Sequence, residues 1–196
     1  MTSRSFAALA AVLLGLTACR AGDPEARAAV TVDSARPASG ALAQFRQGLP
    51  ETRELGGGFA TDRDTLVARF VSALERADTS AFSPMMLDRA EFAWLYYETD
   101  PQAKPPYELP PELMWMQSMQ QGERGIGRAL ARYGGRPLAF RGYTCERHED
   151  RGSIEVWTDC RMDVVSDGGA RMNVRLFGGI VQHAGRYKLL SFANEL

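Results

Sequence analysis

The stretch Cys145–Cys160, CERHEDRGSIEVWTDC, predicts a β-hairpin with a defined register. Its centre, Gly152-Ser153, suits a two-residue type II′ loop, because the first loop position requires a positive φ and favours glycine. Counting back from this loop places Cys145 opposite Cys160. Directly opposed residues of antiparallel strands have Cα atoms about 4.5–5.5 Å apart, which is within the range that a disulfide accepts.

Cys145 and Cys160 are therefore expected to form a disulfide. A bridge that closes a loop of this length stabilises a domain by about 3 kcal/mol. Its role would be to hold the register of the hairpin rather than to take part in chemistry. A pair of buried free thiols is the alternative interpretation of the same two residues.

The same register predicts which side chains of the second hairpin strand share a face. One face is apolar and is expected to pack on helices, and it comprises Ile154, Val156, Cys160, Met162 and Val164. The opposite face comprises Glu155, Trp157, Asp159, Arg161 and Asp163. Trp157, with Leu138 and Phe140, is expected outside the core, where it would suit a homodimer interface or simply be isolated surface apolar area.

Outward from the hairpin, period-two patterns and turn residues predict four consecutive antiparallel strands after a helical half. The strands are Leu138–Arg147, Ile154–Val165, Arg171–Val181 and Arg186–Ala193, and Gly178-Gly179 is expected to mark a bulge in the third. Helices followed by a strand meander predict an α+β fold with the helices on one face of the sheet.

The helical half is expected to contain two long helices and shorter pieces. The first is predicted over residues 62–77, where a capping-box-like start precedes apolar residues at helical spacing. The second is predicted from Pro111 to Tyr133, with Gly134-Gly135 as its stop. Its glycines 122, 125 and 127 predict a kink or a close backbone approach. Asp88–Glu91 is expected to cap another helical piece, and the proline-rich Asp100–Pro111 to be a loop.

The first residues have the order of a secretory signal, with Arg4 before an apolar run from Phe6 to Leu16. That run is shorter than the roughly 20 apolar residues a spanning helix needs. It ends in Leu16-Thr17-Ala18-Cys19, which resembles the lipobox of bacterial lipoproteins. The resemblance implies removal of residues 1–18 and a diacylglyceryl group on the Cys19 sulfur.

Residues 19–41 are expected to be the lipidated cysteine and a flexible tether, and residues 42–196 a single domain. Arg20 follows the cysteine, whereas Asp there would resemble an inner-membrane retention signal. The expected location is therefore the outer membrane, facing the periplasm. Two or more acyl chains would anchor the chain stably.

The segments Asp64–Asp78, DTLVARFVSALERAD, and Gly185–Phe192, GRYKLLSF, with a short helix after the first, are similar to the NTF2-like, SnoaL-like superfamily. The resemblance implies a cystatin-like cone in which a curved antiparallel sheet wraps around helices and encloses an apolar pocket. Members include isomerases, dehydratases and non-enzymatic binding modules, so the fold does not choose the function. The insertion Asp100–Pro111 departs from the compact members.

Charge and cofactor patterns exclude several function classes. The formal charge is −1, and it becomes −2 when the signal and its Arg4 are removed, so no nucleic-acid partner is expected. His148 and His183 have no partner at metal-ligand spacing, and no metal or other cofactor is expected.

The densest unusual chemistry is an aromatic and thioether-rich group, formed by Phe92, Trp94, Tyr96, Tyr97, Tyr107, Met114, Trp115, Met116 and Met119. Such side chains line adaptable apolar pockets, and Trp94, Tyr97, Tyr107 and Trp115 are the candidate ligand contacts. The alternative is that the group is core beneath the proline-rich loop. Glu91 beside Tyr96 and Tyr97 is the candidate catalytic carboxyl, because desolvation among aromatics suits a general acid or base.

These patterns favour a non-catalytic periplasmic lipoprotein that binds an apolar small molecule or an envelope protein. The alternative is an NTF2-like isomerase, dehydratase or hydrolase that uses a pocket carboxylate and tyrosines. A purely structural envelope protein is a third hypothesis.

Overall fold

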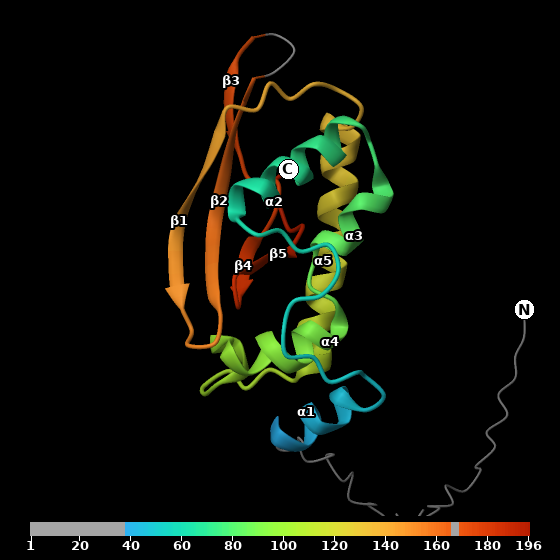
Figure 1. Ribbon diagram of the computed structural model, residues 1–196, viewed down its shortest axis with the longest axis vertical. Helices are drawn as coiled ribbons and strands as arrows, with labels where there is room; N and C mark the ends of the chain where they lie inside the picture. The colour runs from blue at the N-terminus through green and yellow to red at the C-terminus, as the bar shows by residue number, and fades with distance from the viewer. Residues whose placement is uncertain (1–37, 166–168) are drawn as a thin grey trace, which may run out of the picture. The chain divides into compact units, whose positions relative to one another are not determined.

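The computed structural model describes residues 38–165 and 169–196 (Figure 1). The predicted signal segment and Cys19 lie outside the described residues, as does most of the predicted tether. The described residues belong to one compact unit. Among them, no helix combines the length and the apolar character needed to cross a membrane.

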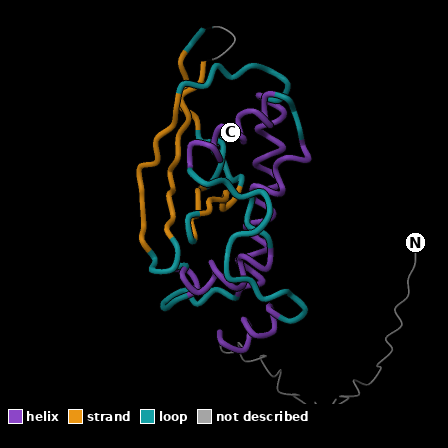
Figure 2. Tube along the Cα trace, viewed as in Figure 1, coloured by secondary structure: helices purple, strands orange, loops and turns teal. Residues whose placement is uncertain are grey.

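The order of elements is helices first and strands second, as Figure 2 shows in purple and orange. The α-helices are α1 (Ala38–Arg46), α2 (Arg63–Glu75), α3 (Phe82–Met85), α4 (Arg89–Glu91) and α5 (Pro111–Tyr133). Tighter or wider helical turns are η2 (Thr79–Ala81), η3 (Phe92–Tyr96), η4 (Tyr97–Thr99) and η5 (Pro101–Ala103). The strands are β1 (Gly142–Asp150), β2 (Glu155–Val165), β3 (Arg171–Val174), β4 (Gly179–His183) and β5 (Arg186–Ser191).

The strands form one open antiparallel sheet in the order β1-β2-β4-β5, with β3 also paired to β2. The predicted α+β class is confirmed. The prediction of four strands is wrong in detail, because Arg171–Val181 is interrupted between β3 and β4, where Leu176 and Phe177 are buried in the core. The expected irregularity at Gly178-Gly179 is present as a register shift between Gly179 and Ile180 in the β4–β5 pair.

The hairpin register predicted from the sequence is confirmed. Cys145 pairs with Cys160 in the β1–β2 ladder, and the two residues form a disulfide. At the turn, the Arg151 N–H donates to the Ile154 carbonyl over 2.9 Å, and Gly152 has a φ of 88°. The loop is therefore Gly152-Ser153, with glycine where the positive φ requires it.

The buried side chains of β2 enter two different core clusters. The first core cluster is built around α2 and the end of α5, and the second around α1, η3 and η4. Cys160, Met162 and Val164 belong to the first, and Ile154 and Val156 belong to the second. Between these groups Asp159 has a left-handed φ of 52°. The prediction of one continuous helix-facing side on β2 is therefore wrong. At Asp159 the alternation of side chains between the two faces of the strand shifts by one residue, so the residues before and after it enter different core clusters.

The same change explains where the side chains expected outside the core lie. Trp157 packs partly buried against the first core cluster, with the Arg63 guanidinium 4.6 Å from its ring centre. Leu138 is fully buried there, and it precedes β1 rather than belonging to it, because Ala139 adopts a φ of 42°. The expectation that Leu138 lies on an outer sheet face is wrong.

Helix α2 is the centre of the first core cluster. Asp62 caps it by accepting a hydrogen bond from the Thr65 N–H over 2.6 Å, which satisfies one of the unpaired donors of the first turn. Its buried face makes aromatic contacts with the segments that flank the strands, including Phe70 with Phe177 before β4 and with Phe192 after β5. Helix and cap agree with the helix predicted over residues 62–77.

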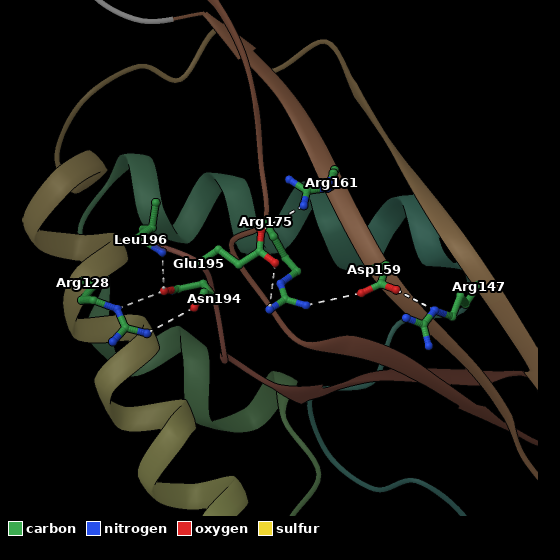
Figure 3. Close-up of polar contacts among 8 residues, drawn as sticks. All are labelled: Arg128, Arg147, Asp159, Arg161, Arg175, Asn194, Glu195 and Leu196. Atoms are coloured by element: carbon green, nitrogen blue, oxygen red, sulfur yellow. Dashed lines mark hydrogen bonds and ion pairs between the residues drawn. The ribbon is translucent and has the colours of Figure 1, made fainter.

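Helix α5 runs from Pro111 to Tyr133 as predicted, and Gly125 allows the chain to cross it closely. A Cβ atom on Gly125 would lie 1.8 Å from the Phe192 carbonyl oxygen. The Asn194 side chain donates to the Gly125 carbonyl over 2.7 Å. The C-terminal tail is also held by Arg128, which hydrogen-bonds to Asn194 (Figure 3).

We expect Gly125→Ala to lower the free energy of unfolding by about 1–3 kcal/mol, because the new methyl group meets backbone that cannot move independently. Gly127→Ala is the control on the same helix. No atom lies within 4 Å of its added Cβ, so this variant should be neutral or more stable by up to about 1 kcal/mol. Urea unfolding measures both, and equal effects of the two variants would contradict the close crossing.

Candidate functional site

A cavity of about 220 Å³ lies between η3, α5 and β5. Residues of three kinds line it. Phe92, Met114 and Leu190 are apolar; Tyr96 and Asp100 belong to a buried polar cluster; Gln102, Gln117, Ser118, Gln121 and Ser191 are neutral hydrogen-bonding residues. The sheet contributes through β5, which brings Leu190 and Ser191 beneath the N-terminal half of α5.

The π-helical turn η3 places two of these residues. The Tyr97 N–H donates to the Phe92 carbonyl five residues back, which widens the turn relative to an α-helix. Phe92, Tyr96 and Tyr97 are consequently all buried, although an α-helical spacing would have placed Tyr97 off the face of the other two. Such wide turns occur frequently at functional sites.

Asp100 is the carboxylate of the cavity wall, and it is held on three sides. Its Oδ2 accepts hydrogen bonds from the Tyr96 hydroxyl over 2.5 Å and from Arg151 Nη1 over 3.1 Å. Its Oδ1 accepts from the Gln102 backbone N–H over 2.8 Å. Arg151 comes from the β1–β2 turn and also pairs with Glu149 over 2.8 Å. The hairpin tip is thereby fixed against the cavity wall.

Burial, and then the negative charge of Asp100, raise the pKa of Tyr96 well above its ordinary value. Tyr96 therefore remains a neutral hydrogen-bond donor over the physiological range. The cluster of Tyr96, Asp100 and Arg151 presents a fixed carboxylate to the cavity while its charge is balanced by the neighbouring guanidinium.

The opposite wall is a polar face of α5. Gln117, Ser118 and Gln121 lie on the side that also carries buried Met114, one to two turns before the close crossing at Gly125. Within the described residues, the side chains of Gln102, Gln117, Ser118 and Gln121 make no hydrogen bond. Four neutral side chains without a protein partner therefore line one open cavity, the three glutamines exposed and Ser118 half-buried.

The candidate catalytic residue Glu91 is placed in a structural role. It is 1% exposed, and both of its carboxylate oxygens contact Lys188 Nζ, at 2.8 and 2.9 Å. The same oxygens accept from the Gly56 N–H over 2.6 Å and from the Asp88 N–H over 2.8 Å. The Asp88 contact completes the capping box of α4. Glu91 does not line the cavity.

The four candidate ligand contacts are not brought together around this cavity. The Tyr97 hydroxyl donates to the Leu109 carbonyl over 2.8 Å, and Trp94 lies under Arg46, whose guanidinium carbon is 4.2 Å from the ring centre. Trp115 packs on Phe92, and Tyr107 is 67% exposed. These contacts favour the alternative interpretation, in which most of the aromatic group is core.

A second polar cluster joins the sheet to the C-terminal tail (Figure 3). Asp159 lies between Arg147, at 2.7 Å, and Arg175, at 3.4 Å. Glu195 of the tail lies between Arg161, at 2.9 Å, and Arg175, at 3.3 Å. Each carboxylate is thus shared by two guanidinium groups, and the arrangement ties the C-terminal tail to the sheet.

Both histidines also have structural contacts. His148 stacks on Trp157, with ring centres 4.6 Å apart, and His183 lies between the carbonyls of Ser153 and Arg53. In the part of the chain that the structure describes, no three potential metal-ligating residues gather.

No protein-family model, curated protein or solved structure matches the chain significantly. The function is therefore inferred from the chemistry of the cavity.

Sequence reasoning missed Asp100, Arg151 and the glutamines of the cavity. Gln117, Ser118 and Gln121 share a helix face with Met114, but polar residues on a partly exposed helix face are ordinary and give no signal of a site. The contact of Arg151 with Asp100 has no local signature, since it depends on where the hairpin tip meets the end of η4.

We expect Lys188→Met to lower the free energy of unfolding by about 3–5 kcal/mol, because it leaves the buried Glu91 carboxylate without its counter-charge. Glu112→Gln is the control, since its pair with Arg89 is largely exposed and should contribute less than about 1 kcal/mol. Urea unfolding compares the two. A loss at Lys188 as small as that at Glu112 would contradict the structural role assigned to Glu91.

Proposed function

We propose that the chain is an exported, lipid-anchored protein of the outer membrane whose domain binds a small molecule without catalysing its conversion. The observation that carries the binding function is the convergence of four unpaired neutral side chains, from Gln102, Gln117, Ser118 and Gln121, on one cavity. Gln102, Gln117 and Gln121 are exposed, so a ligand in the cavity would take the place of the water that solvates them. The lipobox sequence ending in Cys19 supports export and anchoring.

The contacts of the buried carboxylates support binding over catalysis. Glu91 is engaged by Lys188 and two backbone N–H groups. Asp100 accepts three hydrogen bonds, which occupy three of the about four lone-pair positions of a carboxylate. Glu91 therefore does not reach a ligand in the cavity, and Asp100 serves to hold Tyr96, Gln102 and Arg151 together. The NTF2-like enzyme with a pocket carboxylate is therefore the weaker alternative.

We further propose that the antiparallel sheet and α2 are a variant of the NTF2-like arrangement. The support is the order of elements, an opening helix packed on a later sheet that ends in the β4–β5 hairpin. Binding modules without activity occur in that superfamily, which agrees with the proposed function.

Native mass spectrometry of the gently purified chain tests the binding function. We expect a bound small molecule with the wild type and its loss in Ser118→Trp, because the indole fills the cavity. Gln120→Trp is the control, since Gln120 lies exposed on the same helix and does not line the cavity. Retention of the ligand in Ser118→Trp, or co-purification of a protein in place of a small molecule, would contradict the proposal.

The lipid anchor is tested by Cys19→Ser. We expect this variant to lose membrane association, because the acyl chains supply the anchoring free energy of about 0.8 kcal/mol per buried CH₂. The double variant Cys145→Ser/Cys160→Ser should remain with the membrane fraction, since it removes only the disulfide. Fractionation of cells that express each variant measures this, and membrane-bound Cys19→Ser would refute the anchor.

A further inference from the structure

We infer that the ligand of the cavity is a neutral polyhydroxylated ring of monosaccharide size, an inference that rests on the proposed binding function. The inference follows from four properties of the lining: its hydrogen-bonding groups, its charge, its apolar patch and its volume.

The hydrogen-bonding groups match hydroxyls. Each glutamine amide offers two donors and an acceptor, and each serine hydroxyl both donates and accepts. A sugar hydroxyl also donates and accepts, so such groups satisfy it fully. Gln102, Gln117, Ser118 and Gln121 have these capacities unused within the described residues. Asp100 retains about one free lone-pair position, which suits a hydroxyl donor.

The charge of the lining disfavours ionic ligands. Among the ten described residues that line the cavity, none is a lysine, an arginine or a histidine that would attract an anion. Asp100 is the one carboxylate among them, and its charge is balanced by Arg151 at 3.1 Å. A cation there would compete with an existing ion pair, and an anion would lie beside a fixed negative charge.

The apolar patch matches the other face of a sugar ring. Phe92, Met114 and Leu190 line the cavity together with the polar groups. Phe92 is 3% exposed and Met114 is 7% exposed, so both are fixed by packing. A pyranose has C–H groups on its faces and hydroxyls at its edge, and a site with an apolar floor and a neutral polar rim fits both.

The volume suits about one ring. Sites for drug-sized ligands measure about 300–1,000 Å³. The cavity of about 220 Å³ lies below that range. The chemistry is shared by a free monosaccharide and by the terminal residue of a glycan, and these two sources differ at the anomeric oxygen.

Isothermal titration calorimetry tests the inference on the full chain, purified in a detergent without a sugar headgroup. The probes are D-glucose, D-galactose and D-mannose, with glucose 6-phosphate as the anion, glucosamine as the cation and cyclohexanol as the apolar ring. We expect saturable binding of at least one neutral sugar and at least about tenfold weaker binding of its charged derivative and of cyclohexanol. Methyl glycosides of the sugar that binds show the source: equal affinity indicates a glycan terminus, and exclusion indicates a free monosaccharide.

Gln121→Leu should weaken binding of that sugar by about fivefold, the effect of one neutral hydrogen bond, while Gln120→Leu should leave it unchanged. Tighter binding of cyclohexanol or of either charged probe would overturn the ligand class and leave the binding function standing. Absence of binding to every neutral sugar would also overturn it. In that case, a small molecule that co-purifies with the wild type and is lost in Ser118→Trp would show that the binding function itself still holds.

Discussion

The buried ion pair between Glu91 and Lys188 joins β5, which lines the cavity, to the helical segment that leads into η3. Lys188 lies in β5, Glu91 closes the capping box of α4, and the Gly56 N–H adds a loop from before α2. Burying two charges is costly, and hydrogen bonds from the Gly56 and Asp88 N–H groups to the Glu91 carboxylate offset part of the cost. The pair thereby sets where η3 starts relative to β5, and so where Phe92 faces the residues after Lys188.

The charged groups of the domain serve its stability, whereas the groups that we assign to ligand binding are neutral. Glu91 pairs with Lys188, and Asp159 and Glu195 pair with arginines, so these acids hold elements together. Asp100 hydrogen-bonds to Tyr96 and Arg151 at one end of the cavity. The remaining polar side chains of the cavity are neutral and have no hydrogen-bond partner among the described residues. Phe92 and Met114 are buried and fixed by packing, and a preformed wall of this kind binds a ligand with little reorganisation.

Local sequence signals predicted the elements whose causes are local. The Gly152-Ser153 turn fixed the pairing of Cys145 with Cys160, and the proline and glycine limits of α5 marked its ends. Sequence patterns did not predict the phase change at Asp159, because a left-handed residue within a strand leaves the apolar alternation of the letters intact. The wide turn η3 was also missed, since an α-helix and a π-helix differ by less than a residue per turn over so short a segment. The site was the least predictable part, because it brings together groups from the hairpin tip, α5 and β5.

The central claim is that the neutral side chains of the cavity, rather than a buried acid, are the functional groups. Side-chain amide resonances of the glutamines report on this directly in an NMR titration with a neutral sugar. The structure predicts that the signals of Gln102, Gln117 and Gln121 shift with saturation, while that of Gln120, which lies outside the cavity on the same helix, stays in place. Signals from all four that move together, or none that move while the protein binds the sugar, would contradict it.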